Sequence, residues 1–468
     1  MSQNNPPPPR LPPHSSLSVA AFVVALSGFV LGLVPFAGVI GTVGAILAWV
    51  DLSRPDPGGR FRHGLANAAV VLGVIATLSV GVWVFFFYSA LKTVGPGSCP
   101  HVYAFDGERY RLDADLVSGA LYAGAERDDL DRLESLRPTD GEYRVRIADE
   151  LEETDHVDSL SLLYVDHPAG VEVLPTQTGQ LLALRDAAAP IRAVENGESH
   201  DADVLPLLTA LDGQVITGQV GGPEDVGRAR WTLEFARPAT DRVALIVRGH
   251  STPFAEEALG RYLATMGQGL RPLLEWACPE ASASSRRIID EEIERLGLPL
   301  SIQVSSGGAW VDAEALQPVG PAILRSQALI VDLPPGGDRV SFRLQTTPRF
   351  WEIDQIELAP VTSAPLAPTE LPPRAAVRSS GEDVTAALAE RDGAHVVLHP
   401  GEHVDVRFDA PPLAPGLART VVASMRGYYA VDVGGHRGVN PAMLVAHRLG
   451  LVSLQRFARE LTRGAAAP

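Results

Sequence analysis

The densest group of acidic side chains in the sequence comprises Glu126, Asp128, Asp129, Asp131 and Glu134. Carboxylate oxygens that gather in a loop are the ligands that Ca²⁺ prefers. This spacing fits no EF-hand loop, however, and Arg127 and Arg132 stand among the acids. We therefore expect the solvated face of a short helix here rather than a calcium site.

Histidine and serine give no stronger sign of chemistry. His399 and His403 have the HxxxH spacing of a zinc pair, but the Pro-Gly between them prevents the helix that would align the two rings. His250 and Ser251 are neighbours, and neighbours on a strand point to opposite faces. The sequence also has no G-x-S-x-G, Walker or H-E-x-x-H motif. We therefore predict no catalytic residue, no metal ligand and no cofactor.

Tryptophans are the remaining side chains that suggest a ligand. The indole faces of Trp310 and Trp351 would pack well against the C–H groups of a sugar ring, and the carboxylate of Asp354 lies close to Trp351 in the sequence. We take these three residues as candidate binding residues. Burial in the core is the alternative for the two indoles.

The chain contains two cysteines, Cys99 and Cys278. Both follow the apolar N-terminal segments, so an oxidising compartment would permit one disulfide. A disulfide also needs the two Cα atoms within about 7 Å of each other, which the sequence does not show. A Cys99–Cys278 disulfide and two separate thiols both stay open.

The overall charge argues against one class of partner. The 468 residues carry a formal net charge of -17. Such an acidic chain stays soluble and repels phosphate backbones. We therefore expect no nucleic-acid partner.

Two apolar segments near the N-terminus, Leu17–Val50 and Leu65–Leu91, contain no charged residue. A single straight helix over the first would be longer than a hydrocarbon core of about 30 Å. Pro35 lies near its middle and would break or kink that helix. We therefore expect a transmembrane domain at residues 17–92 with three passes, two of them in the first segment. A single pass by the first segment is the alternative.

The loop between these segments contains Arg54, Arg60 and Arg62. Basic loops tend to face the cytoplasm. The Pro-rich tail of residues 1–16 is then cytoplasmic too, and everything after the last pass lies outside. The predicted location is a bacterial inner (cytoplasmic) membrane with an extracytoplasmic C-terminal region, and the lipid bilayer is an expected partner.

The Gly-rich paired apolar stretches and the basic turn of residues 17–90 resemble a short membrane domain of unknown function. That domain is common at the N-termini of bacterial proteins. The resemblance implies an anchor and no chemistry.

The rest of the chain has the pattern of short strands. Asp106-Gly107 lies between the runs His101–Phe105 and Glu108–Leu112 and predicts a tight hairpin. Tyr143, Val145 and Ile147 alternate as in a half-buried strand. Many such strands with Gly/Pro turns favour β-sandwich or jelly-roll-like units. We expect three helices among them, at Pro253–Ala277, Ser284–Leu296 and Pro441–Thr462.

Two stretches of this β-rich region carry further resemblances. The passage from Cys99 to Pro168 is similar to stretches of uncharacterised secreted or lipid-anchored bacterial proteins. Leu300–Pro360, which ends on FWEIDQIELAP, resembles the closing part of jelly-roll carbohydrate-binding modules. The second resemblance implies a sugar-binding sandwich. Together they suggest the membrane domain fused to a member of an uncharacterised extracytoplasmic β-rich family.

These observations predict a helical transmembrane anchor followed by a mainly β extracytoplasmic region with a few inserted helices. After the tail and the membrane domain, the expected parts are a first β-rich domain at 99–220, a second β-sandwich-like domain with a helical insertion at 221–360, a Pro-rich linker at 361–378, and a C-terminal β unit with a terminal helix at 379–468.

Three functions fit this organisation. The first is a membrane-anchored envelope protein whose β-rich region is a binding or scaffold module for an envelope glycan or a protein. The second is a hydrolase of envelope glycans that uses carboxylates such as Glu126, Asp128 and Asp158. The third is a structural envelope protein without a ligand.

Overall fold

The computed structural model describes residues 38–53, 66–72, 74, 100–120, 122–150, 153–196, 201–219, 228–267, 296–431 and 440–465. The chain forms two compact units. The smaller consists of Met1–Thr93, Thr265–Gly267 and Val439–Val452, and the larger consists of Val94–Ala264, Gln268–Gly438 and Ser453–Pro468.

The helical transmembrane anchor is the part of the predicted fold that proves wrong. Helix α2 (Gly38–Leu52) has 15 residues, which span about 22 Å against a hydrocarbon core of about 30 Å. Among the described residues, no helix is long and apolar enough to cross a membrane. Instead, Ala48 of α2 packs with Ala66 and Ala69 in a small buried cluster. The remainder of the two apolar segments, including Pro35, lies outside the described residues.

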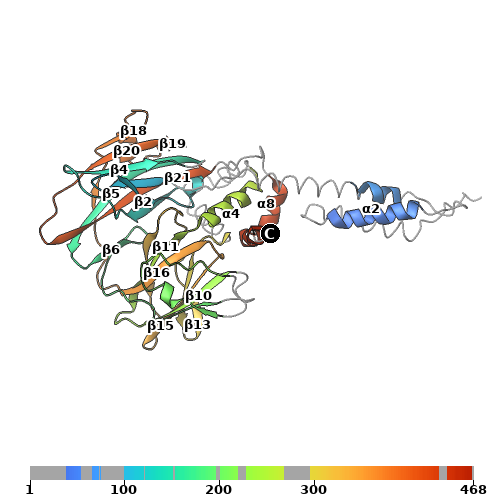
Figure 1. Ribbon diagram of the computed structural model, residues 1–468, viewed down its shortest axis with the longest axis horizontal. Coiled ribbons are helices and arrows are strands. Elements are labelled where there is room, and N and C mark those ends of the chain that lie inside the picture. Colours follow the sequence, from blue (N-terminus) through green and yellow to red (C-terminus); the bar gives the residue numbers. More distant parts are fainter. Residues whose placement is uncertain are drawn as a thin grey trace, which may run out of the picture. The chain divides into compact units, whose positions relative to one another are not determined.

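The prediction of a mainly β chain is confirmed. A first β-sandwich in the larger unit consists of a β18-β20-β4-β1-β2 sheet and a β17-β5-β21-β3 sheet to which β19 adds on β5 (Figure 1). Its strands are β1 (His101–Phe105), β2 (Tyr110–Asp115), β3 (Arg127–Arg132), β4 (Glu142–Ala148), β5 (Glu153–Pro168), β17 (Thr369–Leu371), β18 (Ala375–Arg378), β19 (Val396–Leu398), β20 (His403–Asp409) and β21 (Leu417–Val431). Two short helices accompany them, η1 (Ala123–Ala125) and α7 (Thr385–Ala389).

The core of the first sandwich contains the residues that alternation predicted. Tyr143, Val145 and Ile147 of β4 are buried in one cluster with Leu160 of β5 and Phe408 of β20. The predicted β1–β2 hairpin is also present, but its loop is longer than a two-residue turn because Phe105 pairs with Tyr110. The side chain of Asp106 accepts hydrogen bonds from the backbone N–H groups of Glu108 and Arg109, at 2.9 Å each, and so supports that longer loop.

A second group of sheets lies between the two halves of the first sandwich in sequence. Its sheets are β13-β12-β15-β10-β8-β9, β14-β11-β16 and the β6-β7 hairpin. The strands are β6 (Glu172–Pro175), β7 (Leu181–Leu184), β8 (Arg192–Asn196), β9 (Asp201–Asp203), β10 (Ala229–Ala236), β11 (Arg242–Ser251), β12 (Ser301–Ser306), β13 (Ala309–Asp312), β14 (Arg325–Asp332), β15 (Arg339–Thr346) and β16 (Trp351–Pro360), with the short helix η2 (Leu205–Leu207) after β9.

Strand β11 runs through the centre of this second group. Val243, Leu245 and Val247 are buried, and so are the intervening Ala244 and Ile246, so both faces of the strand are covered. Ala244 and Ile246 pack against apolar side chains of the β6-β7 hairpin. Continuous apolar strands of this kind need a layer on each side.

Strand pairing crosses the domain boundaries expected from the sequence. Strand β20, from the expected C-terminal unit, pairs with β4 of the expected first domain, for example His403 with Ala148. The expected Pro-rich linker at 361–378 contains the strands β17 and β18. The first sandwich is therefore discontinuous in sequence, and the second group of strands forms an insertion within it.

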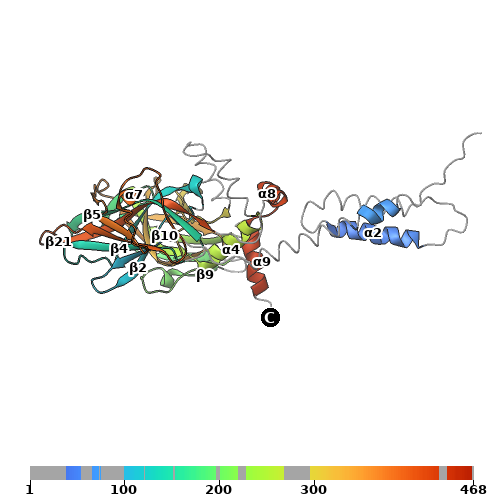
Figure 2. The same ribbon diagram turned by 90° about the horizontal axis from the view of Figure 1, so that it is seen from above.

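Two of the three expected helices are shorter than the sequence predicted, and the third, Ser284–Leu296, lies outside the described residues apart from Leu296. Helix α4 (Pro253–Ala264) begins where expected, and its continuation towards Ala277 lies largely outside the described residues. The expected helix Pro441–Thr462 is two helices, α8 (Pro441–Arg448) and α9 (Leu454–Ala465). Gly450 separates them with a φ of 68°, which a helix interior does not allow. Helix α4 lies beside α9, where the Tyr262 and Phe457 rings meet with centroids 5.8 Å apart (Figure 2).

A glycine at a β-bulge allows the longest strand pair to close. The β5–β21 register shifts between Arg426 and Gly427. A Cβ on Gly427 would overlap the backbone carbonyl oxygen of His156. We expect Gly427→Ala to lower the free energy of unfolding by roughly 2 kcal/mol, because backbone on both sides must move. Urea denaturation followed by tryptophan fluorescence measures this change.

The control for this prediction is Gly337→Ala, since a Cβ at Gly337 meets nothing within 4 Å and its φ is not in the left-handed region. We expect that substitution to change the free energy of unfolding by less than about 0.5 kcal/mol. Equal effects of the two substitutions would show that the close approach at the bulge is unimportant.

Helix α4 buries a carboxyl group whose charge should oppose folding. Burial, and secondarily the charge of Asp115, raises the pKa of Glu256 from 4.5 to about 8. The folded state therefore binds more protons than the unfolded state between these values, and stability falls as pH rises through that window. We expect Glu256→Gln to remove this slope, so that the variant gains several kcal/mol relative to the wild type between pH 5 and pH 8.5. Denaturation midpoints at the two pH values measure the gain, and Glu257→Gln on the same helix should show none.

Candidate functional site

A cavity of about 860 Å³ lies in the larger unit where the first sandwich meets the inserted strands. Strand β3 and the chain just before it contribute one wall, including Glu126, Asp128 and Asp129. The turn Thr176–Gly179 and the segment 313–319 contribute the opposite one. We call this space the junction cavity.

The acidic run that the sequence places on a short helix is in fact strand β3. It pairs with β21, from Arg127–Gly427 to Arg132–Val422. The expectation of a solvated helical face is therefore wrong. Strand geometry sends alternate side chains to opposite faces, so that Asp129 and Asp131 share one face and Asp128 takes the other.

The face with Asp129 and Asp131 meets a buried arginine from the inserted strands. Arg325, the first residue of β14, lies 2.9 Å from an Asp129 oxygen and 3.2 Å from an Asp131 oxygen, and it also donates a hydrogen bond of 3.0 Å to the Leu130 carbonyl. Asp131 and Arg325 are 4% and 5% exposed. Burial raises the pKa of Asp131 to about 7, although the Arg325 charge opposes this shift. Arg325 is therefore the cation that compensates two carboxylates inside the junction.

The opposite face of β3 belongs to a second charged network centred on Arg426 of β21. Its guanidinium lies 2.8 Å from Glu126, 3.6 Å from Asp128 and 3.4 Å from Asp158. Glu126 also contacts His395 at 2.7 Å, and Asp128 contacts Arg391 at 2.9 Å. The three carboxylates that the sequence suggested for a hydrolase thus converge, and they converge on an arginine.

A glutamine fixes the far wall of the junction cavity. The side chain of Gln177 donates to the Ala315 carbonyl oxygen and accepts from the Gln317 N–H at 2.9 Å. Both contacts are to backbone, so Gln177 holds the segment 313–319 against the β6-β7 turn. No sequence pattern pointed to Gln177 or to Arg325, because each acts through residues far away in the chain.

The three candidate binding residues lie away from this cavity. Trp351 is fully buried, and its Nε1 donates to the Leu298 carbonyl oxygen at 2.9 Å. Trp310 is partly exposed, but the Arg343 guanidinium covers its ring at 4.2 Å from the centroid. Asp354 is 2% exposed and accepts two backbone hydrogen bonds, from Asp212 and Gly213. These environments are those of core and turn residues.

The two cysteines and the HxxxH pair are the remaining candidates from the sequence. Cys99 and Cys278 lie outside the described residues, so their disulfide stays a prediction. His399 and His403 flank a turn between β19 and β20 in which Gly401 has a φ of 85°, as the Pro-Gly predicted. Their turn contains no helix that would align the two rings.

No known protein family matches the sequence, and no curated protein matches it either. The resemblances of residues 17–90, of the passage from Cys99 to Pro168 and of Leu300–Pro360 therefore stay predictions.

The charged contacts in the junction predict very unequal effects of two arginine substitutions. Removing the buried Arg325 leaves Asp129 and Asp131 without their cation, which costs about 3–5 kcal/mol in comparable buried pairs. Arg391 is 52% exposed, and its ion pair with Asp128 is worth less than about 1 kcal/mol. We expect Arg325→Ala to lower the unfolding midpoint in urea far more than Arg391→Ala. Similar midpoints for the two variants would contradict a central role of Arg325.

Proposed function

We propose that the β-rich region is a binding module that holds a carbohydrate in the junction cavity. The observation that carries this proposal is the lining of a cavity of about 860 Å³ by hydrogen-bonding groups from both sets of strands. Ligand sites in proteins have volumes of about 300–1,000 Å³. Such sites are also common where two sets of structural elements meet around one space.

The chemistry of the lining favours a ligand rich in hydroxyl groups. The walls contain both donors and acceptors: Arg391 donates, Glu314 and Glu370 accept, and Gln327 and Thr178 do both. A sugar hydroxyl both donates and accepts, so it can satisfy each of these groups. The lining residues described by the structure include no aromatic side chain, so binding would depend on hydrogen bonds rather than on stacking.

The charges of the cavity argue against a strongly ionic ligand. Arg325 and Arg426, the arginines best placed to attract an anion, already contact carboxylates within 3 Å. Glu126, which could attract a cation, is likewise already in contact with Arg426. Placement of the module outside the cytoplasm, and an envelope glycan as its ligand, stay predictions from the sequence.

Binding to a glycan array, followed by calorimetry with the best oligosaccharide, tests the proposal. We expect Glu314→Ala, in the cavity wall, to weaken binding at least about tenfold, because a hydrogen bond to a charged group is worth about 1.5–3 kcal/mol. Glu108→Ala, in the β1–β2 turn, is the matched control and should leave affinity unchanged. Failure of the wild type to bind any oligosaccharide would reject the carbohydrate as ligand.

One observation favours the hydrolase as a second candidate: Glu126 and Asp128 line the junction cavity and lie close enough to share one guanidinium. Arg426 holds both carboxylates in ion pairs, which is why we prefer binding without cleavage. Chromatography of the oligosaccharide after prolonged incubation separates the two candidates. Binding alone predicts that the sugar is recovered intact, whereas cleavage that is abolished by Glu126→Gln would establish a hydrolase.

A further inference from the structure

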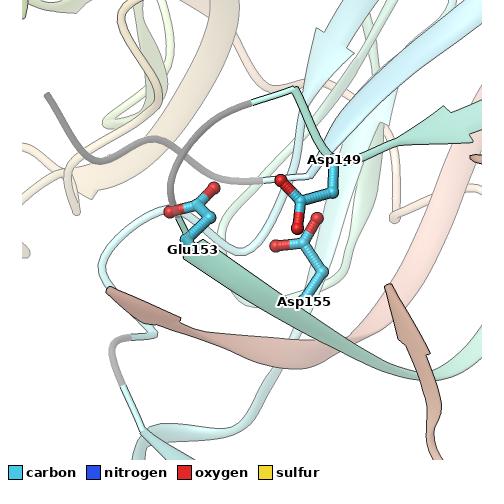
Figure 3. A group of neighbouring side chains, drawn as sticks. All are labelled: Asp149, Glu153 and Asp155. Carbon is cyan, nitrogen blue, oxygen red and sulfur yellow. The ribbon is translucent and has the colours of Figure 1, made fainter. Parts of the chain in front are cut away.

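Three buried carboxylates lie close together at the N-terminal end of strand β5, outside the junction cavity. Asp149, Glu153 and Asp155 are 2%, 3% and 0% exposed. One oxygen of each lies within 4.8 Å of an oxygen of the other two. The carboxylates of Asp149 and Asp155 face each other, with Glu153 beside them (Figure 3).

The backbone that carries these side chains is held on several sides. Asp149 immediately follows β4, and its backbone exchanges hydrogen bonds with the β19–β20 turn, from its N–H to the Glu402 carbonyl at 3.1 Å and from the Gly401 N–H at 2.7 Å. Glu153 and Asp155 are the first and third residues of β5. Asp155 is paired with strands on both sides, β21 and β19. The three carboxylates are therefore held in place by the fold rather than gathered by chance on a mobile loop.

Asp155 is the member of the group that points most directly to a ligand. It is fully buried, and neither of its carboxylate oxygens has a hydrogen-bond partner among the described residues. Buried carboxylates in proteins are almost always hydrogen-bonded, paired or bound to a metal, since an isolated buried charge is very unfavourable. We therefore expect the carboxylate of Asp155 to bind either a proton or a cation.

We propose that Asp149, Glu153 and Asp155 bind one divalent cation, and that this cation is Ca²⁺. A Ca²⁺ ion takes oxygen ligands at 2.3–2.6 Å, so oxygens on opposite sides of it are separated by about 5 Å. The oxygens of these three residues lie within 4.8 Å of one another, which is close enough for all three to bind one such ion. Three carboxylates around one ion also replace a mutual repulsion by an attraction, which would tie β4 to β5.

The ligand chemistry selects against the other common cations. Zinc prefers nitrogen and sulfur, and the group offers only carboxylate oxygens. Magnesium retains several of its waters and needs near-octahedral geometry. Side chains that are 3% exposed or less leave little access for such a hydrated ion. Calcium tolerates irregular geometry and gives up its water more readily.

Proton binding is the competing account of the same geometry. Burial, and then the charges of Asp149 and Asp115, raises the pKa of Asp155 well above its usual value. In that account the carboxyls share protons and no metal is bound. The two accounts differ in what Ca²⁺ does to the whole chain near neutral pH.

The test is calorimetric titration of the full chain, stripped of metal by chelator, with CaCl₂ at pH 7.5. We expect one Ca²⁺ per chain, and at saturating Ca²⁺ a rise in the thermal midpoint of roughly 5 °C. MgCl₂ should bind at least about tenfold more weakly. Absence of Ca²⁺ binding at 10 mM, with an unchanged thermal midpoint, would overturn the proposal in favour of shared protons.

Two matched substitutions locate the ion. Asp155→Asn preserves shape but removes the central charge, so it should weaken Ca²⁺ binding at least tenfold and abolish the thermal shift. Asp113→Asn is the control: Asp113 is also buried, in the same sandwich, but its carboxylate accepts hydrogen bonds from the Ser135 N–H. It should retain the wild-type affinity. Unchanged Ca²⁺ affinity in Asp155→Asn would place the ion elsewhere and reject this site. Because the proposal does not involve the junction cavity, glycan binding can fail while calcium binding succeeds.

Discussion

The antiparallel pairing of β5 with β21 is the constraint on which the rest of the larger unit depends. It joins residues 153–168 to residues 417–431 over the whole length of both strands. The inserted strands β6 to β16, which lie between them in sequence, must therefore leave the first sandwich, and the chain must return to it. Closing so long a loop costs conformational entropy. The burial of apolar side chains in the core of the first sandwich offsets that cost.

The same strand pair positions both candidate sites. At one end, β5 contributes Glu153 and Asp155 to the acidic group. At the bulge it contributes Asp158, which lies 3.4 Å from the guanidinium of Arg426 on the neighbouring strand β21. Strand β3, added at the other edge of β21, then presents Asp129 and Asp131 to Arg325. A single register thus determines where the charged groups of the first sandwich stand relative to one another.

Local pattern was sufficient to predict much of the secondary structure and little of its assembly. Strands such as β4 and β10 were predictable because apolar residues alternate with polar ones along them, and this period needs no partner to be recognised. Strand β3 was missed for the complementary reason. Its inward-facing residues are aspartates, so its alternation is invisible to a rule based on apolar side chains. Acidic residues are tolerated on the buried face of β3 because Arg325 pairs with them. Arg325 is 196 positions from Asp129 in the sequence, so the local pattern does not reveal this pairing.

The candidate sites were still less accessible from sequence. Trp310, Trp351 and Asp354 were selected by residue type, and type does not separate a core indole from an exposed one. Asp149, Glu153 and Asp155 lie close together in the chain but follow no metal-binding motif. What distinguishes them is burial, which depends on β19 and β21 and therefore on pairing with distant segments. The prediction of transmembrane helices was wrong for another reason. It inferred the length of the helices from the length of the apolar segments, whereas the described helix α2 is too short to cross a membrane.

The buried carboxylates at Asp131 and at Asp155 pose the same electrostatic problem, and the fold treats them differently. A chain of net charge -17 with buried carboxylates must compensate them locally, since long-range repulsion adds to the desolvation penalty. At the junction the compensating positive charge belongs to a side chain of the protein, because Arg325 contacts Asp129 and Asp131. At Asp155 the described residues provide no hydrogen-bond donor to either oxygen. A fold that supplies a buried arginine for one group has the means to supply one for the other. Because the fold holds Asp155 among other buried carboxylates instead, we infer that the compensating charge there comes from solution.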